Sequence, residues 1–156
     1  MKQNKETCLS FIRKAKEMLS HYPQIKHNWT IDEEKNNCTL VLPNESENGF
    51  AIMVEIINNE ITIFAGNGHI NYEVYKNVDE EVGRLLGLVR DLLSPGMRIK
   101  ELLAGGKPYK WIFEFFHEGK WLKEAWMGLI FWNYFGKRSE KIYQNNTLPA
   151  REKIMD

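Results

Sequence analysis

Apolar and polar residues alternate most regularly in the segment 50–75, where two turn signals, Asn58-Asn59 and Asn67-Gly68, interrupt the alternation. Asn and Gly tolerate the positive φ that two-residue hairpin loops require, so the segment predicts a three-stranded antiparallel meander. The cross-strand pairs predicted from these loops are Ile57–Glu60, Ile56–Ile61, Val54–Ile63, Ile52–Ala65, Ala65–Ile70, Ile63–Tyr72 and Ile61–Val74.

Side chains of a strand point alternately to its two faces, so the predicted meander has an apolar face and a mixed face. The apolar face collects Ile52, Val54, Ile56, Ile61, Ile63, Ala65, Ile70, Tyr72 and Val74. The mixed face collects Met53, Glu55, Ile57, Glu60, Thr62, Phe64, Asn71, Glu73 and Tyr75. We expect the apolar face to form the core and the mixed face to be an interaction surface.

Apolar residues at helical spacing predict two helices, one before and one after the meander. The first spans about residues 4–20, and the second begins after the N-cap Asn77 and ends at Ser94-Pro95-Gly96. Further strands are predicted at residues 29–33, 38–42, 97–104, 109–117 and 140–144, and residues 148–156 are predicted to be a loose tail. The order helix, four or five strands, helix, three or four strands indicates a single α+β domain, mostly an antiparallel meander sheet packed against two helices.

A hairpin rich in aromatic residues is predicted after the second helix. Residues 121–134 have both helix and strand propensity, and pairing across a two-residue loop favours a strand. This pairing places Trp111 opposite Trp126 and Phe113 opposite Glu124. A carboxylate among aromatic rings would be desolvated and its pKa raised, so these four residues form a candidate pocket. In the alternative arrangements Glu124 lies in solvent at a strand edge or pairs with a lysine on a helix.

The 21 basic and 21 acidic residues are unevenly distributed along the chain. Residues 28–81 hold eleven acids and two bases, whereas the segments before and after them carry net positive charge. A molecule that is acidic on one side suits a basic protein partner. The alternative is that the first helix, whose exposed side is basic, covers the mixed face. The residues that we expect to bind the partner are Glu55, Glu60, Glu73, Phe64 and Tyr75.

Residue types used in catalysis and metal binding are present without the spacing that either function requires. None of the four histidines lies three or four positions from another ligand on a predicted helix. Ser94 has no nucleophile elbow around it, and neither Cys8 nor Cys38 has a base at a recognisable spacing. The sequence therefore indicates no catalytic residue, no metal site and no cofactor, and we interpret the cysteines as reduced thiols.

The longest apolar stretch is far shorter than the roughly 20 residues of a membrane helix, and the N-terminal sequence lacks the apolar run of a signal peptide. We therefore expect a cytoplasmic protein without a membrane partner. Aromatic and basic residues between Tyr109 and Phe135 would suit nucleic acid, but aromatic residues at alternate positions are more typical of a core, which disfavours nucleic acid as a partner.

The capped helix followed by SPGMRIKELLAGGKPYKWIFEFFHEGKW, residues 94–121, resembles the small α+β immunity proteins that bacteria make to neutralise toxins. Small size, an acidic sheet and the lack of a catalytic motif add to the resemblance. It implies a cytoplasmic, non-enzymatic inhibitor that binds one toxin through an acidic surface. The alternatives are a secretion-chaperone-like binding protein, and a small-ligand-binding protein or enzyme with an aromatic pocket around Glu124.

Overall fold

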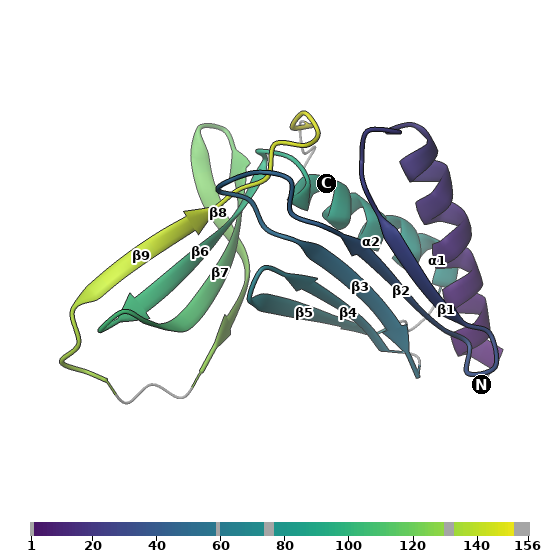
Figure 1. The fold of residues 1–156 in the computed structure, drawn as a ribbon, viewed down its shortest axis with the longest axis horizontal. Coiled ribbons are helices and arrows are strands. Elements are labelled where there is room, and N and C mark those ends of the chain that lie inside the picture. The colour runs from purple at the N-terminus through teal and green to yellow at the C-terminus, as the bar shows by residue number, and fades with distance from the viewer. Residues whose placement is uncertain (1, 59, 74–76, 130–132, 152–156) are drawn as a thin grey trace.

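The computed structural model describes residues 2–58, 60–73, 77–129 and 133–151, which form two helices and nine strands (Figure 1). In chain order these are α1 (Lys2–Ser20), β1 (Asn28–Asp32), β2 (Asn37–Leu42), β3 (Ile52–Ile57), β4 (Glu60–Ala65), β5 (Gly68–Glu73), α2 (Val78–Leu92), β6 (Met97–Ala104), β7 (Lys107–His117), β8 (Lys120–Gly128) and β9 (Arg138–Tyr143). The predicted α+β class and element order are confirmed. The strands form two antiparallel sheets, β1-β2-β3-β4-β5 and β8-β7-β6-β9, where the sequence predicted one main sheet.

The first sheet is the predicted meander with β1 and β2 added at one edge. All four pairs predicted across the first turn are confirmed, and Asn58 has the expected positive φ of 51°. The register predicted across the second turn is wrong by two residues, because Gly66 and Asn67 form the loop and Gly66 takes the positive φ, at 57°. Ala65 therefore pairs with Gly68. A shift of two leaves every side chain on its predicted face.

Both helices pack on one face of the first sheet, which we call the inner face, and Figure 1 shows α2 behind the strands. Burial of this face confirms the predicted core, although Val74 lies outside the described residues. Removing this much apolar surface from water is the main force that holds the helices on the sheet. The buried apolar residues are Cys8, Phe11, Ala15 and Leu19 of α1, Val82, Leu85, Leu86, Leu88, Val89 and Leu92 of α2, and Cys38, Leu40, Leu42, Ile52, Val54, Ile56, Ile61, Ile63 and Ala65 of the sheet.

Polar contacts at the start of α2 join the two helices. Asn77 is the predicted N-cap, and its Oδ1 accepts a hydrogen bond from the Glu80 backbone N–H at 3.3 Å. Asp79 in the first turn accepts hydrogen bonds from Ser10 and Arg13 of α1. The hydrogen bond from Ser10 holds the pKa of Asp79 below its ordinary value. This link is therefore complete above the ordinary carboxyl pKa and is lost as the pH falls through the lowered one.

The second sheet packs against the part of the inner face that β4 and β5 provide. Its inward-facing side chains, among them the buried Ile99, Trp111 and Phe113, belong to the same core as the helices. Gly68 of β5 leaves room for this contact, since a Cβ at that position would lie 2.8 Å from Phe113 Cζ. The two sheets therefore meet closely enough that a single methyl group would not fit.

The chain after β9 packs against α2. Leu148 is buried, and Arg151 Nε donates a hydrogen bond of 2.7 Å to the buried carboxylate of Asp91. Residues 148–151 are thus held in place where the sequence predicted a loose tail, and residues 152–156 lie outside the described residues. Local sequence patterns do not reveal this contact, because Asp91 and Arg151 are 60 positions apart in the sequence.

We expect Gly68→Ala to destabilise the protein by about 1–3 kcal/mol, because the added methyl group overpacks the buried Phe113 ring. Gly83→Ala is the matched control, since the nearest atom to its Cβ is Lys14 Nζ at 3.9 Å. On the exposed side of α2 this change should stabilise by about 0.5–1 kcal/mol. Urea unfolding measures both, and a Gly68→Ala protein as stable as the wild type would contradict the contact between the sheets.

Candidate functional site

The outward face of the first sheet, which we call the open face, has no described element packed on it. α1 contacts the opposite side, where the Phe11 ring lies 5.7 Å from that of the inward-facing Trp29. α2 and the second sheet also pack on the inner face. The alternative in which the first helix covers the mixed face of the meander is therefore wrong.

The open face is acidic in its described part. Glu55 and Glu60 point outward from β3 and β4, and no outward position of the five strands holds Lys or Arg. A third acid, Asp32 at the edge, is paired with Lys35 at 3.6 Å. The described outward-facing residues are Asn28, Thr30, Asp32, Asn37, Thr39, Val41, Met53, Glu55, Ile57, Glu60, Thr62, Phe64, His69 and Asn71.

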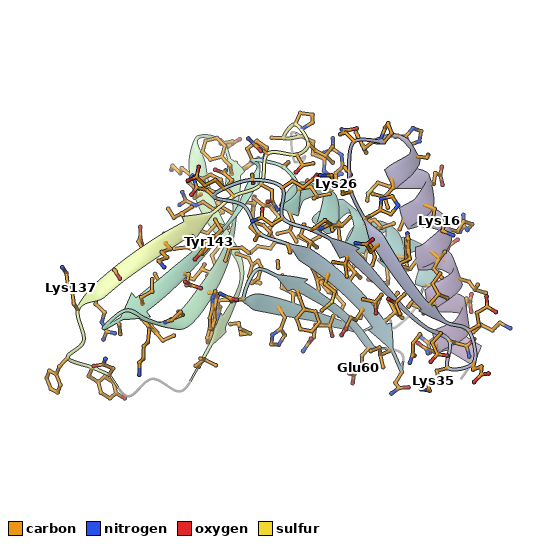
Figure 2. The ribbon with its side chains drawn as sticks, viewed as in Figure 1. Lys16, Lys26, Lys35, Glu60, Lys137 and Tyr143 are labelled. Carbon is orange, nitrogen blue, oxygen red and sulfur yellow. The ribbon has the colours of Figure 1, made fainter. Side chains whose placement is uncertain are left out.

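Two like charges meet on this face. Glu60 on β4 is the diagonal neighbour of Glu55 on β3, since Glu60 lies opposite Ile57 and Glu55 lies opposite Thr62, and like charges on neighbouring strands repel. Figure 2 shows Glu60 at the rim of the sheet. No ion pair of Glu55 or Glu60 with another described residue offsets this repulsion.

Apolar side chains lie beside these acids. Met53 and Phe64 are half-buried and opposite each other in the register, and Ile57 is 38% exposed. The Phe64 ring lies against that of His69, with centroids 5.8 Å apart. Tyr75, the remaining residue that we expected to bind a partner, lies outside the described residues. The open face thus combines carboxylates with apolar surface that no described segment covers.

The hairpin predicted around Glu124 is formed, but part of its predicted pairing is wrong. A β-bulge between Phe113 and Glu114 shifts the register, so Phe113 lies opposite Ala125 and not opposite Glu124. The extra residue of a bulge changes the alignment of everything beyond it. For the same reason Trp126 lies opposite Ile112.

The four residues of the candidate pocket are consequently not brought together. Trp111 and Phe113 are buried in the core, whereas Glu124 is exposed and Trp126 is 58% exposed. The pKa of Tyr72 on β5 is raised above its ordinary value. Burial of the phenol is the larger cause, and the negative charge of Glu124 is the next. A desolvated catalytic carboxylate at Glu124 is therefore not supported.

A different carboxylate, Glu101 on β6, is buried where the two sheets meet. Its oxygens accept hydrogen bonds from Trp111 Nε1 at 2.7 Å, Asn67 Nδ2 at 3.3 Å and Tyr143 Oη at 3.4 Å. Burial and the nearby charge of Glu101 raise the pKa of Tyr143, which keeps this phenol a donor. Three neutral donors from β7, the β4–β5 turn and β9 satisfy the carboxylate, so we interpret this network as a joint between the sheets.

Sequence reasoning missed Glu101, although one signal pointed to it. Glu101 occupies an inward position in the alternation of β6, between Ile99 and Leu103, and a charge at such a position needs partners. A cavity of about 140 Å³ adjoins the network. The cavity is small and the Glu101 carboxylate already accepts three hydrogen bonds, which favours a structural role for Glu101. The cavity is lined by Gly49, Phe50, Gly66, Asn67, Ile99, Glu101, Trp111 and Tyr143.

The described residues offer no centre for metal or thiol chemistry. No group of three His, Cys, Asp or Glu side chains among them could hold a metal ion. Cys8 and Cys38 are free and buried, and they face each other between α1 and β2. Their mutual hydrogen bond, together with burial, raises the pKa of the Cys38 thiol, whereas the same hydrogen bond lowers the pKa of the Cys8 thiol. Both side chains are buried, so neither thiol is presented to a substrate in solution.

Nothing in the described helices is long and apolar enough to cross a membrane. In comparisons with known proteins, no family model, curated protein or solved structure matches the chain. The geometry and charge of the surfaces described above are therefore the basis for a proposed function, and the open face is one that no described element covers.

Replacing Trp111 by Phe should destabilise the protein by about 1–3 kcal/mol, because one acceptor of the buried Glu101 carboxylate would lose its donor. Trp126→Phe is the matched control, since Trp126 is half-exposed and should tolerate the change within about 0.5 kcal/mol. Both free energies of unfolding can be measured with urea. Equal stability of the two variants would show that the Glu101 network does not join the sheets.

Proposed function

We propose that the chain is a non-enzymatic protein-binding domain, of the immunity type, that holds a basic toxin on its open face. The observation that supports this proposal is the uncovered outward face of the first sheet, with Glu55 and Glu60 set among Met53, Ile57 and Phe64. Apolar anchors rimmed by charge are typical of protein interfaces. A sheet face that only had to be soluble would not need these apolar side chains.

Charge determines what kind of partner fits. The repulsion between Glu55 and Glu60, diagonal neighbours on β3 and β4, would be relieved by a Lys or Arg side chain of a bound protein. Complementary charge also steers encounter and raises the association rate, which suits an inhibitor that must capture a toxin quickly. The partner that we propose is therefore a basic protein whose surface carries Lys or Arg around an apolar centre.

We expect Glu55→Lys/Glu60→Lys to weaken partner binding by about 100-fold or more, because like charges facing each other across an interface cost several kcal/mol. Protein captured from bacterial lysates by the wild type would be identified by mass spectrometry, purified and titrated calorimetrically. Binding should weaken with added salt, as expected for exposed charge pairs.

Glu6→Lys/Glu17→Lys is the matched control. It makes the same change in net charge on exposed positions of α1, on the other side of the sheet. The control should bind as the wild type does, and thermal unfolding of both variants should match the wild type. The proposal would be overturned by a partner that binds the open-face variant and the control equally, or by an acidic partner.

A further inference from the structure

The second sheet ends in a surface that the proposed function does not use. We define the tip by the apolar residues Leu129, Tyr134 and Phe135 and the bases Lys137 and Arg138, at the end of β8 and the start of β9. Leu129 is 57% exposed, Tyr134 is 70% exposed and Phe135 is fully exposed. Single exposed apolar side chains are common on protein surfaces, but several of them beside basic residues mark a surface that binds a partner or a membrane.

Backbone contacts fix where the tip lies. The Leu129 N–H donates to the Tyr109 carbonyl at 2.9 Å, and the Gly105 N–H donates to the Lys137 carbonyl at 2.9 Å. The guanidinium of Arg138 lies 5.3 Å from the centre of the Tyr109 ring. The described ends of the tip are thus attached to β7 and to the β6–β7 turn.

The charge of the tip is of one sign. The tip and the described segments around it, 104–110, 126–129 and 133–139, hold four bases, Lys107, Lys110, Lys137 and Arg138, and no acid, and the next acid along β9 is Glu140. Figure 2 shows Lys137 at the end of the second sheet, far from Lys16 on α1. The tip and the open face therefore differ in charge and belong to different sheets.

We propose that the tip docks on the surface of an anionic lipid bilayer. Exposed Phe, Tyr and Leu side chains next to Lys and Arg are the chemistry of segments that lie in a membrane interface. Apolar groups enter the boundary with the acyl chains, while the bases remain among the anionic headgroups and are attracted by their surface potential. Trp126, with Lys110 Nζ 4.6 Å from its ring centre, adds a residue of the same interfacial type.

The arrangement favours a bilayer over single-stranded nucleic acid. Nucleic-acid platforms present a flat face on which successive bases stack and a basic groove follows the backbone. Here Tyr134 and Phe135, the most exposed aromatic residues in the described part of the chain, precede β9 and lie outside the sheet face. The sequence led us to expect no membrane partner because no segment could span a bilayer, and surface docking needs no such segment.

The experiment is co-sedimentation with vesicles of phosphatidylcholine, and of phosphatidylcholine mixed with phosphatidylserine. The wild type should sediment mainly with the mixed vesicles. Tyr134→Ser/Phe135→Ser should lower the bound fraction roughly tenfold or more, because it removes the apolar surface that enters the interface. Lys137→Glu/Arg138→Glu should abolish the preference for phosphatidylserine.

Two controls separate this proposal from others. Phe116→Ser is the first control. It removes an exposed aromatic side chain near the C-terminal end of β7, the end that lies away from the tip, and should leave vesicle binding unchanged. Glu55→Lys/Glu60→Lys should also retain it, so failure here and failure of the open-face proposal are distinguishable. Wild type that sediments with neither vesicle, tip variants that bind as the wild type does, or binding of a dT oligonucleotide in place of vesicles would each overturn the proposal.

Discussion

The whole molecule depends on one constraint: the first sheet buries only its inner face. That face is covered by α1, α2 and the second sheet together. The fully buried residues Val54, Ile56 and Ile63 lie at its centre. Since the helices already occupy the area over the middle strands, the second sheet can pack only on β4 and β5 and extends beyond the first (Figure 1). The opposite face is left to solvent or to a partner.

Polar joints determine how the parts are aligned, because apolar packing alone has little directional preference. Glu101 joins three strands and the β4–β5 turn, because neutral donors on these segments donate hydrogen bonds to its buried carboxylate. Asn145 acts in the same way elsewhere: its side chain bonds the backbone of Phe50 and Leu92, which fixes the chain after β9 to the end of α2. Each joint connects segments distant in sequence.

Local patterns predicted what local chemistry decides. The Asn58 turn, the Asn77 cap and the alternation of β3 and β4 follow from backbone preferences and side-chain direction, and all three are confirmed. The second turn was misplaced because Gly66 and Gly68 are equally permissive, and the bulge near Phe113 has no sequence signal of its own. The division into two sheets and the buried Glu101 depend on long-range contacts, which periodicity cannot reveal. Of the site, the sequence predicted the outward-facing residues of β3 and β4, but it left open whether the first helix covers them.

A molecule can carry no net charge and still be strongly polar in the electrical sense. Here the acids of the open face and the bases around Lys137 belong to different sheets, so the chain has a permanent dipole moment despite its formal charge of zero. Charged patches of opposite sign can attract an anion exchanger and a cation exchanger in turn, whatever the net charge of the molecule. Its isoelectric point would therefore be a poor guide to its purification and to the surfaces that attract it.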